Sequence, residues 1–153
     1  MNDAAVHNLL DPEALAQACA AQMWQVDAAS RALGMVLGEV RPGQASLMMA
    51  VTERMVNGHG ICHGGMIFTL ADSALGFASS TRGEVCLAQH CAITYLRPAR
   101  LGEMLRADAV ERVRDGRSGL YDVRVTARDG VTIAEYRGYV RTTGERLLAG
   151  SAP

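Results

Sequence analysis

Residues 57–72 hold most of the side chains in this chain that are suited to chemistry. The stretch reads NGHGICHGGMIFTLAD, where glycine and histidine give way to an almost wholly apolar run. Asp72 is the only ionisable side chain between His63 and Arg82. Burying a carboxylate among apolar neighbours is costly unless it is paired. We therefore interpret Asp72 as a base that activates water or as a nucleophile. The alternative is a carboxylate that bonds a loop N–H and only holds the fold.

Two glycines, Gly64 and Gly65, stand at the start of the helix that the apolar run predicts. The N–H groups of a first helical turn have no partner within the helix, and the helix dipole favours negative charge there. A carbonyl under attack becomes an oxyanion, which needs such donors in place. We expect the Gly64 N–H to be an oxyanion donor, with His63 fixing the loop or polarising the carbonyl. The alternative is that both glycines only let the helix pack against a strand.

The apolar run predicts a helix over residues 63–80, because its apolar side chains recur at steps of three and four with little polar relief. We expect this helix to be buried on most sides. An earlier helix is expected over residues 12–29. Its start is indicated by Asp11 as a capping acceptor, Pro12 at the first helical position and Glu13 in the first turn.

Alternation of apolar and polar side chains predicts strands around these helices. Two strands flank a turn at residues 41–44, which has proline and glycine at its centre. Four more strands are expected at residues 85–96, 105–114, 120–128 and 131–141. We expect one antiparallel sheet of five or six strands, with one solvent-facing side, wrapped around the buried helix. The tail at residues 144–153 is small and polar and is expected to be frayed.

Length and composition restrict the function. A chain of 153 residues matches one α+β domain over residues 1–153, and its formal net charge of -1 argues against nucleic acid as a partner. No apolar run reaches the length of a membrane span, and the first residues lack the order of a signal peptide. The four cysteines are then expected to be reduced thiols in a cytoplasmic protein.

Three motifs together resemble the hotdog-fold acyl-CoA thioesterases, and within them the phenylacetate-degradation branch most. They are N-G-H-G-x-C-H-G-G-x-x-F-x-L-A-D at residues 57–72, T-Y-L-R-P-A at residues 94–99 and Y-R-G at residues 136–138. The resemblance implies a hydrolase of acyl-CoA thioesters with a hotdog fold, acting on aryl-acetyl or short to medium acyl groups. It implies no cofactor, since coenzyme A is part of the substrate. Met66, Leu70, Leu75 and Phe77 are candidates for the apolar wall.

The resemblance also assigns roles outside the helix. It implies that Asn57 orients water or the thioester, although an asparagine before a glycine is also an ordinary turn residue. Gly65 and His59 are expected to contact the substrate. Arg97 and Arg100 are placed where coenzyme A phosphates could dock, or are two ordinary solvated arginines.

One position departs from the family pattern. Some related thioesterases place a serine or threonine on the strand after the helix, facing the catalytic carboxylate. This chain has Leu-Ala-Gln-His at residues 87–90, so the helper is absent or is replaced by Gln89 or His90.

The distance between two candidate residues on one helix indicates how many chains form one site. Gly64 and Asp72 lie 8 positions apart (72 − 64), which on one helix is roughly 12 Å. One carbonyl carbon cannot lie within about 3 Å of both. If both act on one substrate they come from different chains, so we expect a homodimer with two shared sites. This agrees with the family's edge-to-edge pairing of protomers, and a dimer of dimers is a further expectation.

Three other functions compete with this one. A zinc site would draw on histidines and cysteines near residues 59–63 and 86–91, but there is no C-x-x-C pair, so we expect no metal. A hotdog dehydratase or hydratase typically uses a histidine with an acid on the buried helix, and no histidine follows Asp72 within it. A non-catalytic acyl-CoA sensor would carry a DNA-binding module, for which the residues before the sheet are too few.

Overall fold

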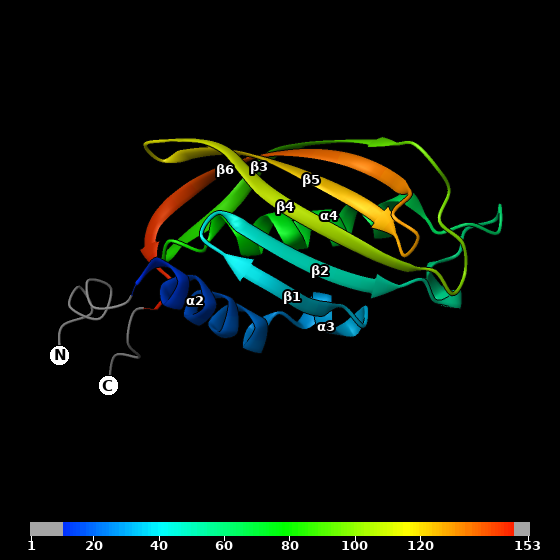
Figure 1. The fold of residues 1–153 in the computed structure, drawn as a ribbon, viewed down its shortest axis with the longest axis horizontal. Helices are drawn as coiled ribbons and strands as arrows, with labels where there is room; N and C mark the ends of the chain where they lie inside the picture. The colour runs from blue at the N-terminus through cyan, green and yellow to red at the C-terminus, as the bar shows by residue number, and fades with distance from the viewer. Residues whose placement is uncertain (1–10, 149–153) are drawn as a thin grey trace.

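The computed structural model describes residues 11–148 and contains one six-stranded antiparallel sheet that curves around a central helix (Figure 1). The strands lie in the order β1-β2-β4-β5-β6-β3. Their bounds are β1 Val36–Arg41, β2 Gln44–Ala50, β3 Glu84–Tyr95, β4 Met104–Asp115, β5 Ser118–Ala127 and β6 Thr132–Arg146. The expected α+β architecture is therefore confirmed.

The central helix α4 (Gly64–Ser79) fills the concave side of the sheet, as its apolar pattern predicts. Half of its residues are buried: Ile67, Leu70, Ala71, Ala74, Leu75, Phe77, Ala78 and Ser79. The inner face of β5 packs on the same core through Tyr121, Val123, Val125 and Ala127. Alternate residues of β5, such as Arg124, face solvent. The solvent-facing side expected for the sheet is confirmed.

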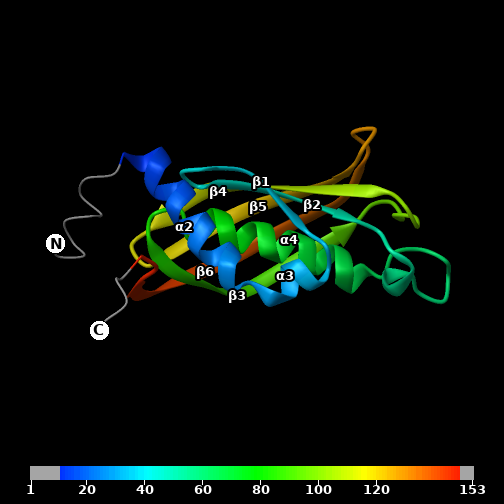
Figure 2. The same ribbon diagram turned by 90° about the horizontal axis from the view of Figure 1, so that it is seen from below.

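Two helices, α2 (Pro12–Val26) and α3 (Ala28–Ala32), lie along α4 beside β1 (Figure 2). The prediction of one helix to residue 29 is wrong, because the chain breaks at Asp27. The Asp27 carboxylate accepts a hydrogen bond from the Ser30 N–H at 2.9 Å and so caps a new short helix. The buried Ser30 hydroxyl then lies 3.0 Å from that of Ser73 on α4.

Strand β6 continues to Arg146, beyond the predicted end at residue 141. Residues 144–146 belong to β6, where Arg146 pairs with Glu84 of β3, so the frayed tail does not begin at residue 144. Thr142, just before them, is buried, and the Leu147 N–H donates to the Gly83 carbonyl at 2.9 Å. Hydrogen bonding to β3 therefore holds this segment. The rest of the predicted tail, residues 149–153, lies outside the described residues.

A polar cluster ties the end of α4 to the sheet. The Glu111 carboxylate accepts hydrogen bonds from the Arg82 guanidinium and, at 2.6 Å, from the hydroxyl of the fully buried Tyr121. Burial by itself raises the pKa of Glu111, but the hydrogen bonds from Arg82 and Tyr121 outweigh it and leave that pKa below its usual value. The charged form of Glu111 therefore stabilises the folded state.

Glu111→Gln is expected to lower the free energy of unfolding at pH 7 by about 1–3 kcal/mol. A depressed folded-state pKa contributes stability above the unfolded-state pKa, and this contribution is lost as pH falls through the folded-state value. The difference from wild type should therefore shrink below about pH 4.3, the usual glutamate pKa. Urea unfolding at several pH values measures this difference in the free energy of unfolding. The control is Glu53→Gln, at a residue that is exposed. A difference that does not change with pH would contradict the assignment.

Candidate active site

The start of α4 presents a free backbone donor. His63 is the N-cap residue, and its Nδ1 accepts a hydrogen bond from the Gly65 N–H at 2.9 Å. The Gly64 N–H has no acceptor within residues 11–148. Because it belongs to the first turn, it also lies at the positive end of the helix dipole. This is the arrangement that a developing oxyanion requires.

A cavity of about 460 Å³ opens beside this donor. Of the residues predicted for the site, Asn57, Gly64 and Arg97 line it. The other lining residues are Ile61, Cys62, Ile67, Tyr95, Leu96 and Pro98. The cavity therefore combines a few polar groups with an apolar wall, as small-molecule sites usually do.

Five predicted site residues, of which Asp72 is one, are not among the described residues that line this cavity. His63 caps the helix instead, and Gly65 donates to it. His59 is exposed on the loop, and Arg100 is exposed after β3, where its backbone N–H donates to Glu103 at 2.8 Å. The predicted wall is also different, since Leu70, Leu75 and Phe77 are buried in the core. Ile61, Ile67 and Leu96 supply apolar surface in their place.

The side chain of Asn57 has a structural role as well as a place on the cavity wall. Its Oδ1 accepts hydrogen bonds from the N–H groups of His59 at 2.9 Å and Ile61 at 3.4 Å, which is an Asx-type turn. The amide NH₂ has no acceptor in the described part of the chain. The turn therefore fixes the amide and leaves its NH₂ group as the donor available to a bound molecule.

Tyr95, at the end of β3, covers the first turn of α4 and was not singled out from the sequence. Its hydroxyl donates to the Gly64 carbonyl at 2.7 Å. A Cβ at position 64 would lie 2.9 Å from Cζ of the Tyr95 ring, so a larger residue there would force the half-exposed ring to move. The packing explanation for Gly64 and the oxyanion explanation are thus compatible.

Asp72 lies two turns further along α4, away from this cavity. It is half-buried, and its Oδ1 accepts a hydrogen bond from the hydroxyl of Tyr136 on β6 at 2.7 Å. The Cys91 thiol on β3 lies 3.9 Å from the same oxygen. Burial, together with the nearby Asp72 charge, raises the pKa of Cys91, so the thiol stays protonated. The carboxylate therefore has partners from two strands.

Of the two alternatives for the helper, neither Gln89 nor His90 is a hydrogen-bond partner of Asp72 within one chain. Both side chains are exposed, and an irregularity in the pairing of β3 with β6 lies between Ala88 and His90. After it, Cys91 is the residue that turns toward α4. The sequence signal that could have found Tyr136 is the Y-R-G motif, to which no role was assigned.

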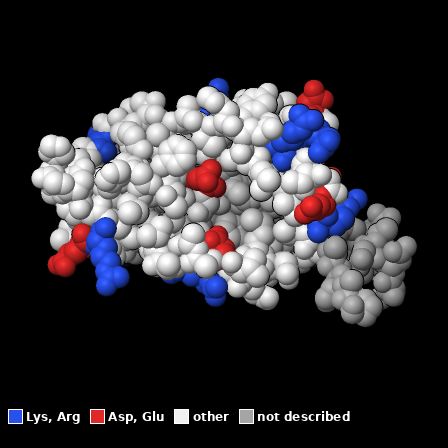
Figure 3. Space-filling view, turned by 180° about the vertical axis from the view of Figure 1, so that it is seen from behind, with Lys and Arg blue, Asp and Glu red and all other residues white. Residues whose placement is uncertain are grey.

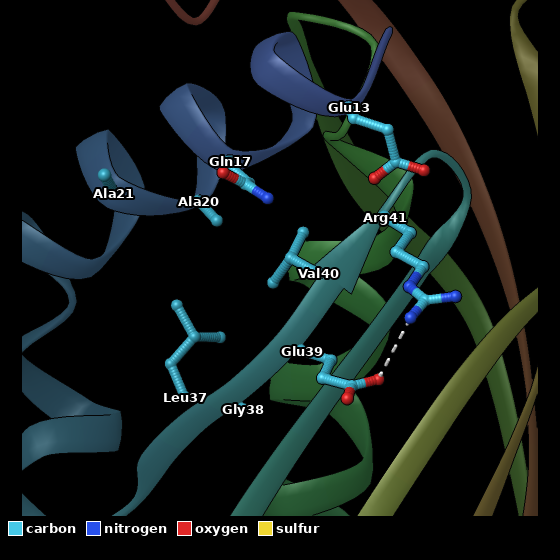
Figure 4. A pocket seen from close by; sticks show the side chains of 9 residues that line it. All are labelled: Glu13, Gln17, Ala20, Ala21, Leu37, Gly38, Glu39, Val40 and Arg41. Carbon is cyan, nitrogen blue, oxygen red and sulfur yellow. Dashed lines mark ion pairs between the residues drawn. The ribbon is translucent and has the colours of Figure 1, made fainter.

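A larger cavity, of about 680 Å³, lies between α2 and β1 (Figure 4). None of the predicted site residues lines it, and Figure 4 shows Glu39 pointing toward Arg41, with which it forms an ion pair at 3.8 Å. Both side chains are largely exposed. Its size alone does not make it catalytic, because its carboxylates are the exposed Glu13 and the ion-paired Glu39.

Residues 11–148 also bear on two other kinds of site, a metal centre and a membrane span. No three histidine, cysteine, aspartate or glutamate side chains there lie close enough to hold a metal ion. No described helix has the length and apolar character to cross a membrane.

Comparison with known proteins places this arrangement in a family. Residues 59–134 match the thioesterase superfamily model. The acyl-coenzyme A thioesterase PaaI of Escherichia coli is 38% identical over 116 residues, which are 76% of this chain and 83% of that protein. The structure of the E. coli PaaI protein, from the phenylacetic acid degradation operon, superposes with a TM-score of 0.87 over 89% of this chain and 99% of that one, at 34% identity.

A Streptococcus mutans protein bound to acetyl-CoA also matches, with a TM-score of 0.69 and 30% identity over 73% of this chain and 90% of that chain. Identity of 30% or more over most of both chains indicates a shared family and fold. The chain belongs to the thioesterase superfamily, with the hotdog fold, and is a thioester hydrolase.

Proposed function

We propose that the protein is an acyl-CoA thioesterase whose active sites are each built from two chains, and that it acts on aryl-acetyl or short to medium acyl groups. One observation carries the proposal. A free Gly64 N–H and the Asn57 side chain line one cavity, while Asp72, on the same helix, lies about 12 Å away and contacts the opposite strands. The Gly64 N–H and the Asp72 carboxylate are the two groups that the reaction needs, and one chain does not bring them together.

In the proposed reaction, the thioester carbonyl accepts a hydrogen bond from the Gly64 N–H of one chain, and the Asp72 carboxylate of the second chain faces the carbonyl carbon. As a base, Asp72 takes a proton from water while the water oxygen adds to the carbonyl. As a nucleophile, it forms a mixed anhydride that water then hydrolyses. In both routes the C–S bond breaks, the thiolate takes up a proton, and free acid and coenzyme A leave.

The edge strand β3 supports the pairing of two chains. It is 12 residues long, ends the sheet, and exposes 58% of Leu87 and 47% of Tyr95. A long edge with exposed apolar side chains is a template for another strand. Pairing β3 with β3 of a second copy would extend the sheet and bring the two α4 helices together. The face opposite Figure 1 is hollowed in its middle, where the charged side chains in view are acidic and the basic ones lie toward the rim (Figure 3). A dimer of dimers is proposed from the resemblance alone.

Arg97 is the proposed contact for coenzyme A phosphates. It lines the cavity, is exposed, and has one guanidinium nitrogen tied to the Thr132 carbonyl at 3.1 Å, which leaves other N–H groups for a phosphate. Arg100 follows three residues later at the same end of β3 and is proposed as a second contact. No cofactor is proposed, because coenzyme A enters as part of the substrate.

A panel of acyl-CoAs, followed by release of free thiol, tests the proposed function. We expect phenylacetyl-CoA, its hydroxylated forms, and short or medium acyl-CoAs to have higher kcat/KM than palmitoyl-CoA. The reason is that the cavity has a volume of about 460 Å³ and is lined by Leu96, Pro98 and the core residue Ile67, which suits a short or aromatic acyl group better than a long chain. A kcat/KM ten-fold higher on palmitoyl-CoA would contradict the substrate class.

The same panel separates the competing functions. A dehydratase or hydratase acts beside the carbonyl and releases no thiol, whereas a sensor binds acyl-CoA without turnover. Absence of thiol release with every substrate, from folded protein, would reject the thioesterase.

A further inference from the structure

We propose that Tyr136 is the positioning residue for Asp72: by occupying Oδ1 it directs Oδ2 of the carboxylate toward the thioester. This inference rests on the proposed function. The hydroxyl of Tyr136 donates to Asp72 Oδ1 at 2.7 Å, and the Cys91 thiol approaches that same oxygen at 3.9 Å. Within residues 11–148, Oδ2 has no hydrogen-bond donor. One oxygen is thus held by the protein and the other is left to react.

The ring of Tyr136 is fixed on both sides. It is 2% exposed and packs edge-to-face on Phe68 of α4, with ring centroids 5.2 Å apart and an interplanar angle of 73°. On the same strand, a Cβ at Gly138 would lie 2.4 Å from a Leu75 methyl and 3.1 Å from the Tyr136 ring. The absence of a side chain at Gly138 therefore leaves the space that the Tyr136 ring and Leu75 occupy. This accounts for the glycine of the Y-R-G motif.

The charge environment distinguishes Asp72 from structural carboxylates of the chain. Glu84, Glu111, Asp122 and Glu135 each pair with an arginine. Asp72 has no cationic partner in the described chain; its titratable neighbours are Tyr136 on β6 and Cys91 on β3. A half-buried carboxylate held only by neutral donors is not engaged by a cation, so it is left for a reaction. Burial, with the hydrogen bonds to Cys91 and Asp72, raises the pKa of Tyr136, so it remains a donor.

Tyr136→Phe tests the assignment, because it removes the hydroxyl and keeps the ring. A hydrogen bond to a charged group is worth enough to lower kcat by about 10- to 100-fold. KM should stay within about three-fold, since no contact with the substrate is lost. The acid limb of the kcat/KM–pH profile should move to higher pH, because the carboxylate loses a donor that favours its charged form.

Tyr121→Phe is the matched control. Tyr121 is also a buried tyrosine on the neighbouring strand, and its hydroxyl also donates to a carboxylate, that of Glu111, at 2.6 Å. Both variants should lose stability, but Tyr121→Phe should keep kcat within about two-fold and leave the pH profile in place. Equal losses in the two variants, or an unmoved profile in Tyr136→Phe, would overturn the proposal and leave Tyr136 as a packing residue.

Two further measurements keep this test separate from that of the proposed function. Adding Tyr136→Phe to Asp72→Asn should cause no further loss of kcat, because the two residues act through one group. If Asp72→Asn is inactive while Tyr136→Phe turns over normally, only the positioning role fails. If Asp72→Asn is active, Asp72 leaves the mechanism and the positioning role fails with it, whereas absence of thiol release from the wild-type protein rejects the proposed function itself. Should Tyr136→Phe not fold, fluorotyrosine at position 136 serves instead. A more acidic phenol should shift the acid limb to lower pH, and an unchanged limb would reject the role.

Discussion

Asp72→Asn is expected to lower kcat by about 10²–10⁴-fold while the protein stays folded. An amide cannot take a proton from water or attack a thioester, so either proposed role of Asp72 is lost. The fold should be retained because the asparagine oxygen can still accept the hydrogen bond from Tyr136, and no ion pair with Asp72 is present among the described residues to be broken. Thiol release from phenylacetyl-CoA measures the loss of kcat, and circular dichroism measures whether the fold is retained.

The control for this variant is Asp108→Asn. Asp108 lies on β4 and pairs with Arg106 at 2.9 Å, with both side chains more than two-fifths exposed. The same chemical change at this surface should leave kcat within about two-fold, since exposed ion pairs contribute little to stability. An Asp72→Asn variant that keeps more than about half of the native kcat would remove Asp72 from the mechanism.

The elements of the fold could be predicted because their signals are local. The apolar period of three to four marks α4, and the alternation in β5 marks its buried face; both are confirmed. The break at Asp27 was missed because a single capping side chain, rather than the apolar pattern, ends α2. The extension of β6 to Arg146 was missed because it depends on pairing with Glu84, 62 positions earlier (146 − 84).

The candidate site could be predicted only in part, for the same reason. Gly64, Asn57 and Asp72 belong to one continuous motif and were visible in the sequence, and their roles stay predictions. Tyr136 is 64 positions from Asp72, and Tyr95 is 31 positions from Gly64, so both contacts depend on the register of strands. Spacing in a sequence does not give that register. Gln89 and His90 stand at the strand position that the family pattern indicates, as one alternative to an absent helper, and an irregularity in the pairing of β3 with β6 lies between Ala88 and His90.

Mixing two inactive variants is expected to restore activity if each site belongs to two chains. Asp72→Ala lacks the carboxylate, and Asn57→Ala lacks the amide on the wall that Asn57 shares with Gly64. In a mixed dimer, one site receives Asn57 from the first chain and Asp72 from the second, and is intact; the other receives both defects. Random pairing at equal amounts makes half of the dimers mixed, so about a quarter of native activity should return after reversible dissociation.

A second mixture uses the same two residues, and in it a shared site should lower the activity where the first mixture restores it. A chain that carries both Asn57→Ala and Asp72→Ala is mixed with an equal amount of wild type. Before the chains exchange, the mixture should have about half of the activity of an equal total amount of wild-type protein. If sites are shared, every site of a mixed dimer has one defect, so the activity after exchange should fall to about a quarter of that reference. If each site lies within one chain, activity stays at about a half in this mixture, and none appears in the first. That pair of results, with mixed dimers verified by native mass spectrometry, would show that Gly64 and Asp72 do not serve a common substrate. The helix would then still separate them by about 12 Å, so only one of the two could remain in the mechanism.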